Sequence, residues 1–149
     1  MTGLPDVDPA DRVVLADVVD TPVSVEHVAD VVATDQDGAV VTFAGVVRDH
    51  DGGKGVTALG YERHPSAGAV IAEVARSIAE AHPGVRIAVL HRVGDLVVGD
   101  VALAAAVSSP HRAEAFAACA ALVDLVKESV PIWKHQEFTD GSDEWVASL

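Results

Sequence analysis

The sequence predicts an α+β fold, in which a mixed or largely antiparallel sheet packs against about three helices. Its 149 residues are near the usual size of one domain, and half of them are hydrophobic, which is enough to bury a core. Short β-branched runs are interspersed with helical patterns, but their order lacks the strict strand–helix–strand alternation of a parallel α/β fold. No internal repeat or long linker divides the chain, so one folding unit is expected.

The beginning of the chain differs in composition from the rest. Residues 1–10 contain two prolines and two aspartates and are predicted to form a flexible tail, so that residues 11–149 make a single domain. The first residues lack the basic start and the apolar segment of a signal peptide. No run approaches the roughly 18 apolar residues of a membrane span. We therefore expect a cytoplasmic protein that does not bind or cross a membrane.

The first part of the domain is predicted to be a strand, a helix and a second strand. The Val-rich segment 12–19 is typical of a strand. Ser24 is a favourable N-cap for a short helix over residues 25–33. A polar turn at residues 35–38 then leads into the β-branched run 39–47, which predicts a buried strand.

The middle of the chain begins with a glycine-rich stretch. The segment RDHDGGKGV, residues 48–56, is polar, contains three glycines and is predicted to be a mobile loop. Residues 57–63 resume as a strand. Ser66 is a candidate N-cap for a helix that ends near Ala81, because Pro83–Gly84 follows.

The second half is predicted to hold the longest helix among further strands. Those strands are expected at residues 85–91, 101–108 and 132–138, the last of them ending the fold. Ser109 followed by Pro110 is a strong helix start, with serine as N-cap and proline in the first turn. The helix should reach about Lys127, before Pro131 stops it.

The charge balance excludes several classes of function. The formal net charge is −13, whereas a general nucleic-acid binder of this size would be basic, and an anionic membrane surface is disfavoured for the same reason. The charges are unevenly spread, since residues 1–38 carry nine acids and one base and nine of the ten bases follow them. The cations can therefore form a local positive pocket on an acidic body.

Metal and cysteine chemistry are not indicated. The single cysteine, Cys119, lies in an apolar run and is predicted to be a core thiol, so neither a disulfide nor a cysteine-based zinc site is possible. None of the seven histidines forms a zinc motif, and the pair His91–Arg92 at a strand end favours a structural or anion-facing role. We expect no metal and no resident cofactor.

One candidate site lies in the run S-S-P-H-R, residues 108–112. His111 and Arg112 would occupy the first turn of the long helix, where free backbone N–H groups and the helix dipole attract anions. Cations normally avoid this helix end, so the pair favours a bound anion such as a phosphate. The alternative is a surface turn with Arg112 paired to a carboxylate such as Glu114.

A second candidate site consists of Lys127 and Lys134. The chain has only three lysines, and these two flank the Pro131 break between helix and strand. Such a hairpin directs both amines to one cleft, where repulsion would favour a neutral amine nucleophile or base. The alternative reading of Lys127 is favourable contact with a helix C-terminus.

Arg48 completes the cationic set. It directly follows a predicted buried strand, a position common for ligand-binding side chains, although a solvated loop arginine is the alternative. Its loop lacks the pattern of a phosphate-binding P-loop. Arg48, His111, Arg112, Lys127 and Lys134 together predict a metal-free cationic site for a small phosphorylated or carboxylated substrate.

Five motifs resemble, in order, the large, catalytic subunit of molybdopterin synthase. The most specific of them ends in P-I-W-K and carries another lysine seven residues before its last one. The motifs are V-T-F-A-G-V-V-R (41–48), Y-E-R-H-P (61–65), L-H-R-V-G (90–94), S-S-P-H-R (108–112) and K-E-S-V-P-I-W-K (127–134).

The resemblance implies an α/β-hammerhead-like fold and a sulfurtransferase. Such enzymes add two sulfurs to cyclic pyranopterin monophosphate to form the dithiolene of molybdopterin. The sulfur comes from a thiocarboxylate on the C-terminal glycine of a small ubiquitin-like carrier, which ends in Gly-Gly and threads into the large subunit. The large subunits form a central homodimer with one carrier at each end.

The resemblance also implies roles for residues. Lys127 and Lys134 would be the catalytic lysines, while Arg48, His111 and Arg112 would bind the substrate, partly across the dimer interface. One departure matters: family members often carry Glu two residues after the second lysine, where this chain has Gln136 followed by Glu137. The alternatives are a non-catalytic dimer that binds a pterin or a partner's tail, and an unrelated lysine-dependent enzyme for phosphorylated metabolites.

Overall fold

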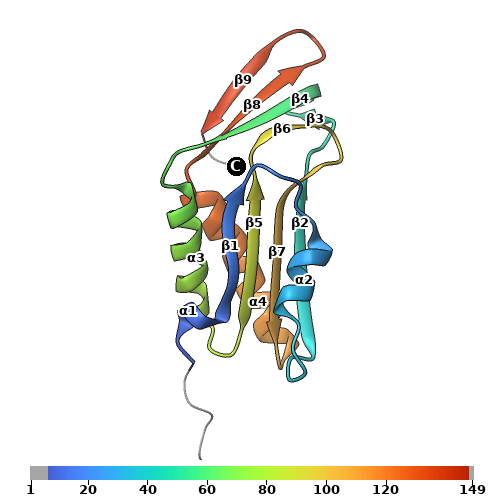
Figure 1. Cartoon of the computed structure of the whole chain (residues 1–149). Coiled ribbons are helices and arrows are strands. Elements are labelled where there is room, and N and C mark those ends of the chain that lie inside the picture. The colour runs from blue at the N-terminus through green and yellow to red at the C-terminus, as the bar shows by residue number, and fades with distance from the viewer. Residues whose placement is uncertain (1–6, 148–149) are drawn as a thin grey trace, which may run out of the picture.

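The computed structural model describes residues 7–147, and it confirms the α+β prediction (Figure 1). This part of the chain contains helices on both faces of one sheet and a second sheet at its end. In chain order the elements are α1 (Pro9–Arg12), β1 (Val13–Val19), α2 (Val25–Val32), β2 (Ala39–Val46), β3 (His50–Asp51), β4 (Lys54–Arg63), α3 (Ala67–Ala81), β5 (Arg86–Arg92), β6 (Gly94–Leu96), β7 (Val101–Ser109), α4 (Arg112–Ser129), β8 (Ile132–Phe138) and β9 (Asp143–Ala147).

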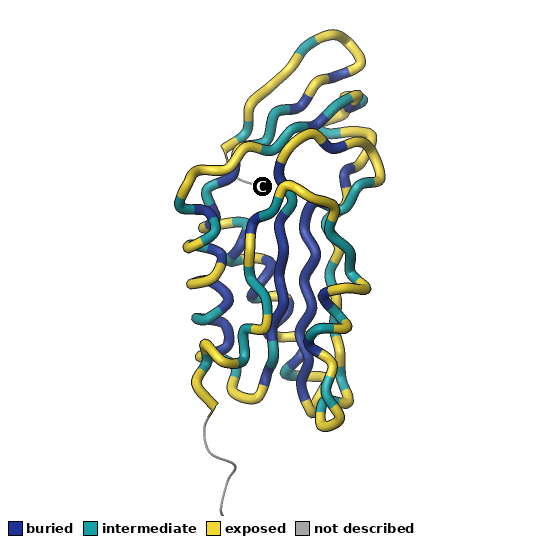
Figure 2. Tube along the Cα trace, viewed as in Figure 1, coloured by how far each residue is buried: buried dark blue, intermediate teal, exposed yellow. Residues whose placement is uncertain are grey.

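The first sheet has the strand order β1-β5-β7-β2. The strand β1 runs parallel to β5, whereas β7 is antiparallel to both of its neighbours. Helix α2 covers one face, and α3 and α4 cover the other (Figure 1). The central strands β5 and β7 are therefore buried almost throughout (Figure 2), which explains their nearly continuous apolar sequences.

The core is divided by this sheet into two parts. The larger part lies against α3 and α4 and includes Ile71, Ile87 and Leu122, all fully buried. The smaller part lies under α2 and includes Val28 and Leu90. Burial of each such side chain stabilises the fold by about 1.5–3 kcal/mol, so the two parts of the core hold the helices against the sheet.

The second sheet is antiparallel and crosses one end of the first, in agreement with the expected hammerhead-like arrangement (Figure 1). Its order is β3-β4-β8-β9, and β6 also pairs with β4. A small apolar cluster joins the two sheets and contains Val47, Leu59, Leu96 and Ala102. The ends of β2 and α4 consequently lie beside the second sheet, where the functional side chains gather.

The predicted helix caps are only partly correct. The Ser24 side chain accepts a hydrogen bond of 3.1 Å from the His27 N–H, as expected of an N-cap. Ser66 makes no such bond to α3. Ser109 is the last residue of β7, where it pairs with Ala39, and α4 begins only at Arg112 with His111 as its N-cap. The strand extends one residue beyond the prediction and the helix starts two residues later than Pro110, because the backbone hydrogen bonds of the sheet outweigh the local capping preference.

The prediction of a mobile loop at residues 48–56 is wrong, because this stretch forms the β3–β4 hairpin. His50 pairs with Gly55 and Asp51 with Lys54, across a turn in which Gly52 and Gly53 have φ angles of 56° and 80°. Two consecutive positive φ angles are those of a type I′ turn, which matches the twist of a hairpin. Strands β6 and β9 were also not predicted, so β8 is not the last strand.

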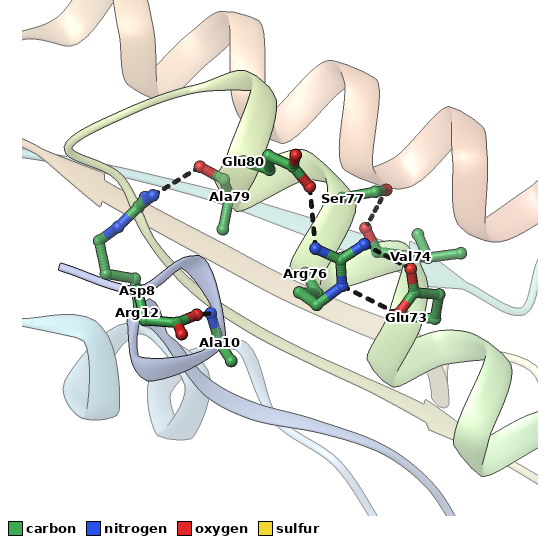
Figure 3. Close-up of polar contacts among 9 residues, drawn as sticks. All are labelled: Asp8, Ala10, Arg12, Glu73, Val74, Arg76, Ser77, Ala79 and Glu80. Carbon is green, nitrogen blue, oxygen red and sulfur yellow. Dashed lines mark hydrogen bonds and ion pairs between the residues drawn. The ribbon is translucent and has the colours of Figure 1, made fainter. Parts of the chain in front are cut away.

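A single helical turn, α1, precedes the first sheet. Its residue Arg12 donates a hydrogen bond of 2.7 Å to the Ala79 carbonyl oxygen and so satisfies an open carbonyl in the last turn of α3 (Figure 3). It also donates to the Val85 carbonyl oxygen, beyond that helix, at 2.9 Å. Residues 1–6 of the predicted tail lie outside the described residues, and Pro9 and Ala10 begin this turn. Within residues 7–147, no helix has the length and apolar character needed to cross a bilayer.

Candidate active site

A cavity of about 340 Å³ opens between the two sheets and the end of α4. Three of the five predicted site residues line it: Arg48, Lys127 and Lys134. Four further polar residues on its wall were not predicted as functional residues. These are Asp51, Tyr61, His91 and Gln136.

Local structure explains why both lysines reach this cavity. Lys127 lies in the last turn of α4, where a cation is favourable next to the helix C-terminus. The chain then becomes extended at Val130, and β8 begins at Ile132. Lys134 is the third residue of that strand, and only about a fifth of its side chain is exposed. The predicted helix-to-strand hairpin is thus confirmed, and it directs both amines into one cleft.

A network of charged and polar groups connects the cavity wall. Asp51 lies 3.3 Å from the Arg48 guanidinium and 4.0 Å from the Lys134 ammonium. The Gln136 amide donates at 2.7 Å to Oδ2, the carboxylate oxygen that faces Lys134. The hydrogen bond from Gln136 is the main cause that lowers the pKa of Asp51, and the charges of Lys134 and Arg48 lower it further. Asp51 is therefore an anion among the cations of the site.

His91 is a neutral group on the same cavity wall. Its Nδ1 lies 2.8 Å from the Arg92 carbonyl oxygen, which can only accept, so Nδ1 carries the hydrogen and Nε2 is left as an acceptor. Burial lowers the pKa of His91 to about 4, and the charge of Lys127 acts in the same direction. The ring packs edge-on against Tyr61, with 5.1 Å between centroids. In the sequence, His91 was marked only by the motif that it shares with Arg92. The Arg92 side chain, however, forms an ion pair with Asp100.

The structure does not bring His111 and Arg112 to this cavity within one chain. Both side chains are exposed and line a separate, shallow pocket with Gly38, Ala39 and Pro110. Arg112 begins α4 and Lys127 is near its end, so about 22 Å of helix separates them at 1.5 Å per residue. The expected convergence of five cations holds for three of them in a single chain. The alternative partner Glu114 lies 3.4 Å from His82.

The donor set of the described residues does not suggest a metal centre. Residues 7–147 contain no group of three or more His, Cys, Asp or Glu side chains arranged to hold a metal ion. Cys119 is buried in the core, and this burial raises the pKa of its thiol to about 11. The cavity instead offers ammonium and guanidinium groups, which bind anions and stabilise negative charge as it develops.

Comparison with known proteins assigns the family. The family model described as MoaE protein matches residues 18–129, three quarters of the chain. A molybdopterin synthase catalytic subunit 1 from Mycobacterium tuberculosis is 44% identical over 130 residues, covering 85% of this chain and 86% of the relative. The chain belongs to the MoaE protein family. A Nostoc molybdopterin synthase catalytic subunit is 40% identical over 128 residues, with 85% and 78% covered.

Solved structures of MoaE relatives share the fold. The crystal structure of molybdopterin synthase from Staphylococcus aureus superimposes with a TM-score of 0.83 at 34% identity, covering 89% of this chain and 96% of that one. A MoaE protein from Burkholderia ambifaria gives a TM-score of 0.75 at 28% identity, with 88% and 87% covered. The resemblance identified from the motifs is thereby confirmed.

Proposed function

We propose that this chain is the catalytic subunit of a molybdopterin synthase, and that its cavity is the site where sulfur is transferred. The enzyme would take sulfur from a thiocarboxylated small carrier and add it to cyclic pyranopterin monophosphate, forming a dithiolene. The observation that carries this proposal is the placement of Arg48, Lys127 and Lys134 on one cavity in a member of this family.

We propose that the two lysines stabilise the negative charge that develops during sulfur transfer. The carrier's sulfur would form a carbon–sulfur bond with the substrate as a carbon–oxygen bond of the substrate breaks, and that oxygen leaves on the phosphate or as water. Water then hydrolyses the resulting thioester, which breaks the carrier's carbon–sulfur bond and leaves a carboxylate on the carrier. Lys127 and Lys134 would stabilise the negative charge on the sulfur and on the acyl oxygen. The second sulfur requires a second loaded carrier. The neutral Nε2 of His91 provides an acceptor for an N–H or O–H group beside them.

The substrate's phosphate would be held by Arg48 and, from a second chain, by His111 and Arg112. A separation of about 22 Å along α4 excludes a shared site within one chain. The strand β2 forms an edge of the first sheet, and apolar side chains are exposed on β2 and α4, namely Val40, Val46 and Phe116. Exposed apolar groups on neighbouring elements support a homodimer in which each site receives residues from both chains.

The partner is proposed to be a small ubiquitin-like protein whose C-terminal Gly-Gly carries the thiocarboxylate. A cavity of about 340 Å³ suits an extended glycine tail, which brings no side chains and is recognised mainly through its main chain. We place this activity in the cytoplasm. A chain with one cysteine, buried and unpaired, requires no oxidising compartment for its fold.

Reconstitution tests this function directly. The purified chain is mixed with cyclic pyranopterin monophosphate and a thiocarboxylated carrier, and the dithiolene product is measured. Product should form with this carrier and not with a carrier that ends in an ordinary carboxylate. An Arg76→Ala chain, which loses an exposed cation of α3 outside the cavity, serves as the matched control and should retain full turnover. Lack of product from the intact chain and loaded carrier would refute the proposal.

A further inference from the structure

We propose that Asp51 is a positioning residue for Lys134, and that Gln136 holds the Asp51 carboxylate in place. This proposal deepens the function proposed above, because it concerns how one catalytic lysine is aimed. It goes beyond the five cationic residues, since it assigns a role to one anion and one amide on the same cavity wall.

The first observation is the contact set of the Asp51 carboxylate. One oxygen, Oδ2, lies 4.0 Å from the Lys134 ammonium and accepts a hydrogen bond of 2.7 Å from Gln136. The other oxygen, Oδ1, accepts from the Arg48 guanidinium at 3.3 Å. A single carboxylate therefore contacts two cavity cations and one amide, which fixes where their side chains point.

The second observation is how rigidly the chain presents Asp51. It is the last residue of β3, directly before the Gly52–Gly53 turn, and it pairs with Lys54. The hairpin is fastened to the end of β8, because the Thr139 N–H donates to the Gly55 carbonyl at 2.8 Å. A Cβ at Gly55 would lie 2.9 Å from the Thr139 methyl carbon, so this approach requires glycine. The glycine-rich segment thus serves as a rigid support for one carboxylate.

The third observation concerns Gln136, which is almost fully buried with 3% of its surface exposed. Its amide nitrogen donates to Asp51 and to Glu144, at 2.7 Å and 2.9 Å, so both amide hydrogens are used. A carboxylate at this position would repel these two anions, whereas an amide binds both. Gln136 shares one face of β8 with Lys134, whereas Glu137 lies on the other face and is exposed. Glu137 therefore does not take part.

These contacts predict a specific division of work. Asp51 keeps the Lys134 ammonium directed into the cavity, and Gln136 keeps Asp51 ionised and oriented. Removing the carboxylate charge would leave Lys134 free to adopt other rotamers. Turnover should then fall while carrier binding, which uses the rest of the cavity, is retained.

An amide–carboxylate exchange tests this division. Asp51→Asn should lower kcat by about 10- to 100-fold, the equivalent of a charged hydrogen bond, with the carrier KM changed by no more than about twofold. Asp51→Glu keeps a carboxylate at the same position, within reach of Lys134 and Gln136. This conservative variant should retain most of the kcat that Asp51→Asn loses. Asp124→Asn, an exposed carboxylate of α4, is the matched control and should have wild-type kinetics.

Two outcomes would overturn the assignment: wild-type kcat in Asp51→Asn, or an Asp51→Glu variant no more active than Asp51→Asn with an unchanged melting temperature. A readout without turnover separates this proposal from the proposed function. The Lys134 Cε resonance should move in Asp51→Asn and stay near its wild-type position in Asp51→Glu. If the intact chain made no product but this resonance behaved as stated, the function would fail and the positioning role would stand. If the resonance did not move, the positioning role would fail whatever the turnover.

Discussion

The two ends of α4 hold the two pairs of cations predicted from the sequence, and the structure surrounds them very differently. At the C-terminal end, Lys127 shares a cavity with Lys134, which lies on β8 of the second sheet. At the N-terminal end, His111 and Arg112 are exposed beside a shallow pocket. The charge of Arg112 there opposes the helix dipole, which is unfavourable unless an anion lies beside it. Under the proposed function, one chain would supply the reacting end of a site, and its anion-binding end would be completed by another molecule.

The strongest test of this contrast is Lys127→Ala. We expect product formation to fall by at least about 100-fold, because a preorganised cation is lost from the cavity. The dimer should persist, since Lys127 lines the cavity rather than the exposed apolar surface. Single-turnover assays with loaded carrier, together with sedimentation, measure both properties. Normal turnover would remove Lys127 from the reaction.

Arg112→Ala tests the other end of the helix. It should weaken substrate binding by about 10- to 100-fold, as expected for a lost charged hydrogen bond, and alter turnover at saturation much less. Binding is measured by titration with cyclic pyranopterin monophosphate. An unchanged affinity would show that this end of α4 does not hold the phosphate.

Mixed dimers test whether Lys127 of one chain and Arg112 of its partner share a site. Lys127→Ala and Arg112→Ala chains are unfolded, mixed in equal amounts and refolded, and turnover is measured at limiting substrate. If each site takes Lys127 from one chain and Arg112 from its partner, half of the dimers are mixed and contain one intact site of two. Activity should then recover to about a quarter of the wild-type value, by the symmetry of a two-fold dimer. No recovery above the two single variants would place both residues in the same chain's site.

His91, on the cavity wall, should have a smaller effect, which is measured in the stability of the fold rather than in turnover. The pKa of His91 is lowered to about 4 in the folded protein, against 6.5 for an ordinary histidine, so the unfolded chain takes up this proton first. Stability contributed by neutral His91 is complete above pH 6.5 and is lost as the pH falls toward 4, by up to about 3 kcal/mol. His91→Asn should reduce the change of the urea unfolding midpoint with pH between these two pH values. His27→Asn, an exposed histidine of α2, should leave the slope unchanged.

A substitution at Cys119, in the middle of α4, should have little effect on turnover or stability. Cys119 is 4% exposed, and the pKa of its thiol is raised to about 11 by burial, so the native protein should react slowly with thiol reagents at pH 8. Cys119→Ala should keep full turnover and cost no more than about 1 kcal/mol of unfolding free energy. Fast labelling in the native state, or lost turnover in this variant, would contradict the assignment of the thiol to the core.

The comparison also shows which features the sequence could predict. Pro131 and the lysine spacing reveal a helix that turns back as a strand, and this local geometry sufficed to place Lys127 and Lys134 together. Asp51 could not be found in the same way, because its role depends on strand pairing between β4 and β8, far apart in sequence. The glycines that suggested a mobile loop are those that a type I′ turn requires. Distant pairings, rather than local propensities, account for most of what the sequence did not predict.

The cavity also links function to the completion of folding. Its lining runs from Gly45 to Gln136 and draws on strands of both sheets and the end of α4. Contacts between such distant segments form late, since the entropy of closing long loops must be overcome first. A partly folded intermediate with only the first sheet in place would lack Asp51, Lys134 and Gln136 in their positions. It would lack Lys134 beside Lys127, so under the proposed function sulfur transfer would be confined to molecules that have finished folding.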